Sequence, residues 1–200
     1  MQDQTLLKKI LFIAICMSIS ASLQVFQHVF IYWRFSFFEE IWRWWTAHWV
    51  HVGWIHYFLN MIAFACLPFI FPHVKTRYLF ILLLLLPPLI SLSFYYYFSH
   101  IEAYAGLSGV LHGLYIAVAL YFLKFSKERK FSLLVIVLIS AKIIWENIFG
   151  SLEVSQLIGS TVLIEAHLLG LIWGAILALG YMSYEYFKTQ ASIKRTKEYE

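Results

Sequence analysis

A single serine lies among three glycines in the segment YAGLSGVLHG, residues 104–113. A serine hydroxyl is a weak nucleophile until a base within hydrogen-bonding reach accepts its proton. Neutral histidine suits that role, and one stands far downstream in the segment EAHLLGLIWG, residues 165–174. A third residue that orients the base is helpful but not obligatory. We therefore take Ser108 and His167 as a candidate nucleophile and base.

Candidate oxyanion donors occur in the segment AHWVHVGWIHYFLNM, residues 47–61. His56 and Asn60 are four residues apart, so a helix presents their imidazole and amide N–H groups on one face. A tetrahedral intermediate of acyl transfer needs such donors, and losing one typically costs about 10²–10³ in rate. The backbone N–H of Ser108 is a third donor if the serine begins a helix, where amides are unpaired.

The elements that must position these residues are predicted to be membrane-spanning helices. Of the 200 residues, 62% are hydrophobic and 13% are charged, against roughly 25% charged in ordinary soluble domains. The composition predicts an all-α polytopic membrane protein in which residues 1–200 form one domain, with a basic cytoplasmic tail at about 188–200. Six segments are near the ~20 residues that a bilayer requires: Leu6–Val25, Val50–Phe71, Tyr78–Phe98, Leu107–Leu123, Phe131–Ile148 and Ile164–Phe187.

Charge predicts the orientation of these helices. With both termini in the cytoplasm, 12 of the 15 lysines and arginines lie on the inner side, as the positive-inside rule favours. The net charge of +4 therefore needs no nucleic-acid partner. In this N-in, C-in arrangement, the second, fourth and sixth helices all begin at the outer face. Their polar residues share one depth, where such side chains usually face a bundle interior or a wet cavity.

Small residues indicate how two of these helices meet. Gly106, Gly109 and Gly113 form one stripe, and a second consists of Ala166, Gly170, Gly174 and Ala178. Such stripes let helix backbones approach closely, and His167 shares the face of the second stripe. Packing of one stripe against the other would turn His167 toward Ser108. The alternative is that the glycines serve helix packing alone.

These motifs resemble the rhomboid family of intramembrane serine proteases. The matching features are Trp42-Arg43, the spacing of His51, His56 and Asn60, the GLSG segment, and His167 followed by Gly170 and Gly174. The resemblance implies a six-helix rhomboid-like bundle. It implies Ser108 as nucleophile, His167 as base, and an oxyanion hole made by His56, Asn60 and the Ser108 amide. It also implies a structural hydrogen-bonding role for His51 and single-span substrates that enter sideways, past the fifth helix.

A finer resemblance is to the rhombosortase branch, through GLSGVLHG, AKIIWE and EAHLLG. That branch implies a bacterial inner-membrane enzyme whose site faces the periplasm. Its substrates carry a C-terminal Gly-Gly, an apolar span and a basic tail (the GlyGly-CTERM anchor), and are released by type II secretion. Cleavage can be coupled to transfer onto a lipid-derived amine. The segment FPHVKTRYL, residues 71–79, departs from the acidic and glycine pattern of the broad family at a cytoplasmic turn.

Three polar residues near the expected site have two interpretations. His112 stands four residues after Ser108 and could compete as base, although a packing role is favoured. Lys142 and Glu146 are also four residues apart, which favours a neutralising ion pair over a surface that lines the substrate path.

Other function classes have weaker signals in the sequence than a serine protease has. A metal-dependent hydrolase could use the imidazoles of His48, His51 and His56, but no H-E-x-x-H motif is present. A glutamyl protease is suggested only by Glu39-Glu40, and a transporter would show internal symmetry or broken helices. A rhomboid-like pseudoprotease that binds transmembrane clients is disfavoured because Ser108 and His167 are both retained. We expect neither a metal nor a cofactor; the expected partners are the bilayer and transmembrane substrates with a C-terminal anchor.

Overall fold

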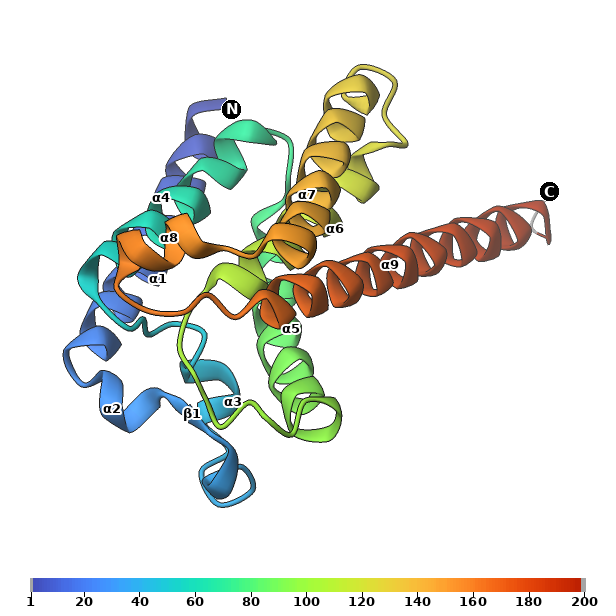
Figure 1. Ribbon diagram of the computed structural model, residues 1–200. Helices are drawn as coiled ribbons and strands as arrows, with labels where there is room; N and C mark the ends of the chain where they lie inside the picture. Colours follow the sequence, from blue (N-terminus) through green and yellow to red (C-terminus); the bar gives the residue numbers. More distant parts are fainter. Residues whose placement is uncertain (1, 199–200) are drawn as a thin grey trace.

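The computed structural model describes residues 2–198, with side chains described for residues 6–151 and 155–192. Helices dominate the chain (Figure 1). The longer ones are α1 (Gln2–Val25), α4 (Trp54–Ile70), α5 (Thr76–Tyr97), α6 (Ser108–Phe122), α7 (Arg129–Phe149) and α9 (Ile164–Glu198). The short elements are α2 (Gln27–Phe30), β1 (Tyr32–Trp33), η1 (Arg34–Ser36), α3 (Arg43–Thr46), β2 (Ala103–Tyr104) and α8 (Leu152–Ile158).

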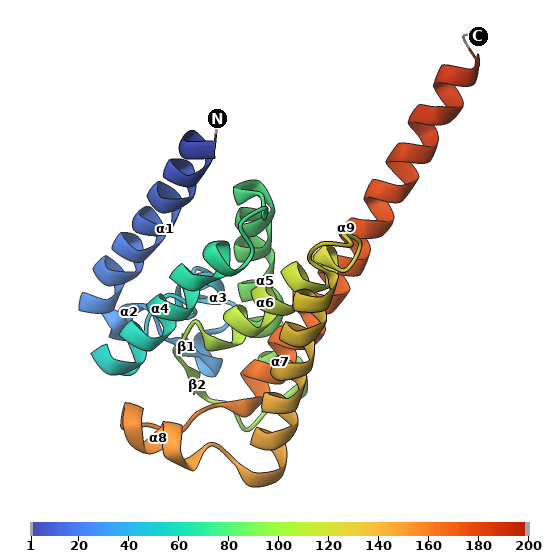
Figure 2. The ribbon, with the colours of Figure 1, turned by 90° about the horizontal axis from the view of Figure 1, so that it is seen from above.

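All six predicted spans correspond to long helices, and each helix begins within four residues of its predicted start. Among the described residues, α1, α5, α7 and Ile164–Ser192 of α9 are long and apolar enough to cross a bilayer. Helices α4 and α6 are apolar but have only 17 and 15 residues. The chain is therefore a multi-pass membrane protein. Helix α9 extends to Glu198, so the described part of the predicted tail continues the last helix (Figure 2).

Helix α6 is the centre of the bundle. Ten of its fifteen residues are buried and none is exposed, because α4, α5, α7 and α9 each pack against it. Helix α7, by contrast, buries only Ser132, Ile143 and Glu146 and exposes most of its apolar side chains. Figure 2 shows α1 and α7 at opposite margins, with α4, α5 and α6 between them.

The two glycine stripes lie directly against each other. A Cβ added at Gly170 would fall 1.8 Å from the carbonyl oxygen of Gly109, and one at Gly174 would fall 2.3 Å from that of Gly113. A Cβ at Gly109 would itself lie 2.7 Å from the carbonyl oxygen of Ala166. Only glycine allows the α6 and α9 backbones to approach this closely. The contact sets the first turns of α6 and α9 side by side.

The loop between α1 and α4 contains β1, which pairs with β2 in the segment between α5 and α6; the sequence analysis did not predict this pairing. Strands β1 and β2 are antiparallel, with Tyr32 opposite Tyr104. Buried Arg43 fastens this loop: its guanidinium donates to the Ile31 carbonyl at 2.6 Å and to the Glu40 carboxylate at 2.8 and 3.1 Å. Hydrogen bonding from Arg43 holds the pKa of Glu40 below its usual range. The β2 pairing anchors the segment that leads into Ser108.

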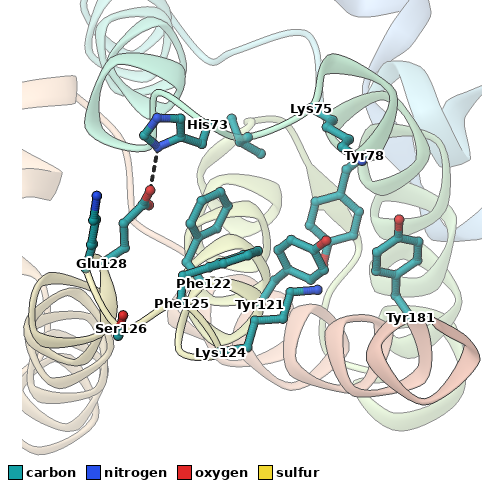
Figure 3. A pocket seen from close by; sticks show the side chains of 12 residues that line it. His73, Lys75, Tyr78, Tyr121, Phe122, Lys124, Phe125, Ser126, Glu128 and Tyr181 are labelled. Atoms are coloured by element: carbon teal, nitrogen blue, oxygen red, sulfur yellow. Dashed lines mark hydrogen bonds and ion pairs between the residues drawn. The ribbon is translucent and has the colours of Figure 1, made fainter. Parts of the chain in front are cut away.

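The other end of α6 borders a separate cavity of about 530 Å³ (Figure 3). His73, in the turn predicted to depart from the family pattern, bonds Glu128 across it at 2.5 Å. Lys124 lies 3.6 Å from the centre of the Tyr121 ring and bonds Glu185 at 2.6 Å. Because α6 rises about 1.5 Å per residue over its 15 residues, this cavity is roughly 20 Å from Ser108. It does not belong to the predicted site.

Candidate active site

A cavity of about 340 Å³ surrounds the start of α6 and contains both members of the predicted dyad. Four helices supply its polar side chains. They are His56 and Asn60 from α4, Ser108 and His112 from α6, Lys142 and Glu146 from α7, and His167 from α9. Residues up to 111 positions apart in the sequence, His56 and His167, thus line one space.

Ser108 is the first residue of α6 and is half-buried. Its backbone N–H therefore has no acceptor within the helix. The preceding turn depends on Gly106, whose φ of +148° is favourable only for glycine. A Cβ there would also lie 2.9 Å from the His56 ring. This glycine lets the imidazole of His56 pack close to the serine-bearing turn.

His51 makes a structural contact with the same turn. Its Nε2 accepts a hydrogen bond from the Leu107 N–H at 3.4 Å. Its own backbone is held by the side chain of Gln24, which accepts from the His51 N–H at 2.7 Å and donates to the His51 carbonyl at 2.8 Å. His51 therefore ties α1 and the start of α6 together, and does not line the cavity around Ser108.

His56 and Asn60 both line the cavity, but one of the hydrogen-bond donors of Asn60 is already used within α4. The amide of Asn60 donates one hydrogen to the His56 carbonyl at 2.9 Å, within α4. An amide NH₂ has two hydrogens, so the second remains for a ligand. The His56 ring stands edge-on to His51, with centroids 4.9 Å apart. Both predicted oxyanion donors thus line the space beside Ser108, with one Asn60 hydrogen already committed.

His167 is buried, and its two ring nitrogens have different surroundings. Nδ1 lies 2.8 Å from Glu146 Oε2, whereas Nε2 has no hydrogen-bond partner among the described atoms. The other carboxylate oxygen of Glu146 accepts from Lys142 Nζ at 2.5 Å. The i, i+4 ion pair of Lys142 and Glu146 is therefore confirmed. Its contact with His167 is an addition that the spacing did not predict.

His112 packs against the predicted base. The two imidazole rings are stacked, with centroids 4.2 Å apart and planes 22° apart. His112 Nδ1 lies 2.7 Å from the Ser108 carbonyl oxygen, which only accepts, so Nδ1 carries the proton. Nε2 lies 3.2 Å from Lys142 Nζ, an ammonium that only donates. With both nitrogens occupied, His112 is placed for packing and not for accepting the Ser108 proton.

His48, His51 and His56, the donors of the metal alternative, do not form one metal-ligand group among the described residues. His48 bonds Ser91 at 3.0 Å in a separate buried contact. Among the described side chains, the only three metal-ligand groups that lie within 4.8 Å of one another are those of His112, Glu146 and His167. Lys142 Nζ bonds two of these three. Since that ammonium already supplies the positive charge, the group does not fit a metal ion.

The glutamyl-protease alternative also lacks a site. Glu40 is engaged by Arg43 in the loop between α1 and α4, and neither Glu39 nor Glu40 lines the cavity that contains Ser108.

Tyr104 is a residue that sequence reasoning did not consider. Its buried hydroxyl donates to the Gly106 carbonyl at 2.6 Å. Burial raises the pKa of Tyr104, so the phenol is neutral and keeps its proton for this contact. The one sequence feature that could have indicated this role is the position of Tyr104, two residues before Gly106. The contact fixes the turn from which Ser108 projects.

The family model described as the Rhomboid domain matches residues 39–184, well over half of the chain. The chain belongs to the rhomboid family. No curated protein matches the sequence. Rhomboid proteins are intramembrane serine proteases that act on transmembrane substrates, so this rhomboid chain has the fold of a membrane-embedded peptidase. The matched range includes all the polar residues that line the cavity around Ser108.

Proposed function

We propose that this rhomboid is an intramembrane serine endopeptidase that uses Ser108 and His167 as a catalytic dyad. The observation that carries the proposal is the shared cavity: close glycine packing of α6 and α9 sets both residues in it, and His167 Nε2 is unpartnered there. A base nitrogen without another partner is available to accept the serine proton. The site faces the periplasm if the predicted N-in, C-in topology of six spans is correct.

In the proposed reaction, His167 Nε2 takes the proton from Ser108 Oγ as that oxygen attacks the scissile carbonyl carbon. The negative charge that develops on the carbonyl oxygen is stabilised by N–H groups of His56, Asn60 and the Ser108 backbone. His167 then gives its proton to the leaving amine, and an acyl-enzyme remains on Ser108. A water molecule or another amine attacks the acyl carbon and releases the serine.

Two cavities meet at Ser108 and suggest separate routes for the two reactants. The cavity toward α7 also has apolar walls, including Leu59 and Ile139. A second cavity of about 310 Å³ shares Ser108 and His56 but lies against the linker before α9, where Ser160 and Thr161 line it. We propose that a transmembrane substrate approaches between α4 and α7, and that water or the acceptor amine arrives through the second cavity.

The finer proposal is a rhombosortase activity. It rests on the similarity of GLSGVLHG, AKIIWE and EAHLLG to that branch, and these segments supply Ser108 and four of the polar residues around it. The proposed substrates carry a C-terminal Gly-Gly, an apolar span and a basic tail, in the inner membrane of a Gram-negative bacterium with type II secretion. The resolving nucleophile is water or a lipid-derived amine.

Cleavage by purified protein tests the serine mechanism. Wild type, Ser108→Ala and His167→Ala are given a tagged substrate with a Gly-Gly and basic-tail anchor, in detergent. We expect cleavage by wild type and loss of about 10⁴-fold or more in either variant. Equal cleavage by all three proteins would exclude the serine mechanism.

A second substrate tests the rhombosortase assignment separately. The Gly-Gly of the same tagged anchor is replaced by Leu-Leu, with the span and basic tail unchanged. Preferential cleavage of the Gly-Gly form is expected. Equal cleavage of both forms would be consistent with the serine protease assignment but would exclude specificity for the Gly-Gly anchor.

A further inference from the structure

Glu146 lies behind the predicted base in a fully bonded, buried arrangement. Its side chain is 6% exposed, and each carboxylate oxygen has one partner: His167 Nδ1 at 2.8 Å and Lys142 Nζ at 2.5 Å. A buried carboxylate is costly unless it is paired and hydrogen-bonded. Here the Lys142 ammonium compensates the charge. The carboxylate is thereby kept as an acceptor for the imidazole.

The Glu146 contact determines which nitrogen of His167 carries the proton. An ionised carboxylate only accepts hydrogen bonds, so the bond to Glu146 requires a proton on Nδ1. In the neutral ring the other nitrogen, Nε2, then carries the lone pair. That nitrogen is the one without a partner. The tautomer that a general base requires is thus the tautomer that Glu146 selects.

Glu146 belongs to α7, the helix with the least buried surface near the site. Of its residues, only Ile143 and Glu146 are buried in the outer half. Lys142 additionally bonds His112, which stacks on His167. Two side chains of α7 therefore contact two of the three imidazoles of the cavity, those of His112 and His167. A purely structural ion pair on α7 would not need to reach a histidine on α9.

We propose that Glu146 is a positioning residue that completes a Ser108–His167–Glu146 triad, an inference that rests on the proposed function. Glu146 fixes the orientation and tautomer of His167 and stabilises the imidazolium formed when Nε2 takes the Ser108 proton. The proton stays on Nε2 until the leaving amine receives it, and Glu146 itself is not protonated. Lys142 holds the second carboxylate oxygen. The catalytic unit therefore extends over three helices, α6, α7 and α9.

Replacement of the acid by its amide tests this role. Glu146→Gln keeps the size of the side chain but presents a neutral group, whose NH₂ can favour the wrong tautomer of His167. In serine proteases with an acid–histidine pair, this change lowers kcat by about 10⁴-fold. We expect at least a 100-fold fall in kcat with KM changed less than threefold, and partial recovery in Glu146→Asp. Labelling of Ser108 by a fluorophosphonate falls with kcat.

The matched control is Glu165→Gln, the same change two residues from His167. Glu165 is partly exposed and bonds His100 at 3.3 Å. We expect wild-type kcat and KM for this variant. A Glu146→Gln enzyme with wild-type kcat, or with a raised KM alone, would overturn the triad and favour a substrate-lining role. A Glu146→Asp enzyme as inactive as Glu146→Gln would overturn it as well.

Nitrogen NMR of wild-type protein labelled with ¹⁵N-histidine tests the tautomer even if Glu146→Gln does not fold. The His167 signals, assigned by their loss in His167→Gln, are expected to show a protonated Nδ1 and an unprotonated Nε2. The opposite tautomer would overturn the inference. Ser108→Ala separates the two proposals: if it cleaves like wild type, the proposed function fails. If it is inactive while Glu146→Gln is active, only the triad fails.

Discussion

Lys142 is the residue that decides against metal chemistry at the candidate site. Its ammonium bonds both Glu146 and His112, two of the three groups that could otherwise surround a divalent cation. A metal ion would have to displace it and accept its repulsion. We expect cleavage to be unchanged after dialysis against EDTA, because the nucleophile is activated by His167. Loss of activity with EDTA and its recovery with Zn²⁺ would contradict this.

Arg43 is a second residue whose side-chain chemistry has a measurable effect, here on the stability of the fold as a function of pH. It holds the pKa of Glu40 below its usual range, so this pair stabilises the fold above the ordinary carboxyl pKa of about 4.3. That contribution is lost as the pH falls through the lowered pKa of the folded state. We expect Arg43→Met to lower the melting temperature in detergent at pH 7. The difference in melting temperature between wild type and Arg43→Met should become smaller below pH 4. If that difference did not change with pH, the ion pair with Glu40 would contribute nothing to stability.

At the scale of helices, the contact between α6 and α9 positions the site. A Cβ at Gly170 would fall 1.8 Å from the Gly109 carbonyl oxygen, whereas one at Gly180 of the same helix meets no atom within 4 Å. Overpacking typically costs about 1–3 kcal/mol. We expect Gly170→Ala to lower both the melting temperature and kcat, since it separates Ser108 from His167. Gly180→Ala should retain activity and gain slight stability from helix propensity.

This pair of variants has a clear contrary outcome. If Gly170→Ala and Gly180→Ala had the same activity and melting temperature, close approach of α6 and α9 would not be what assembles the site. The measurement is a thermal shift in detergent combined with cleavage of the tagged substrate.

The helices and much of the site were predictable because the sequence encodes them locally. Gly109, Gly170 and Gly174 mark a close-packed face by their spacing, and His167 shares that face. The bond between His167 and Glu146 was not predictable. Spacing within α7 reveals only the Lys142 neighbour, and which face of α7 meets α9 depends on the packing of both helices. The pairing of β1 with β2 was missed because two-residue strands have no periodicity.

For the whole molecule, the charge distribution predicts an orientation in the membrane that a fusion experiment tests. Four described helices are long enough to span, while α4 and α6 are shorter. The predicted N-in, C-in topology requires all six to cross. We expect alkaline phosphatase fused within residues 150–163 to be active, and a fusion within residues 124–128 to be inactive, because that enzyme folds only outside the cytoplasm. The reverse pattern would invert the topology and move the site to the cytoplasmic side.

The central claim is that Ser108 is a nucleophile activated by His167. Mass spectrometry of the fluorophosphonate-treated protein tests it most directly, because the site of the adduct identifies the nucleophile without a known substrate. We expect one adduct, on the peptide that contains Ser108, and its loss in a folded His167→Ala variant. An adduct on another residue, or equal labelling of Ser108 in the absence of His167, would contradict it.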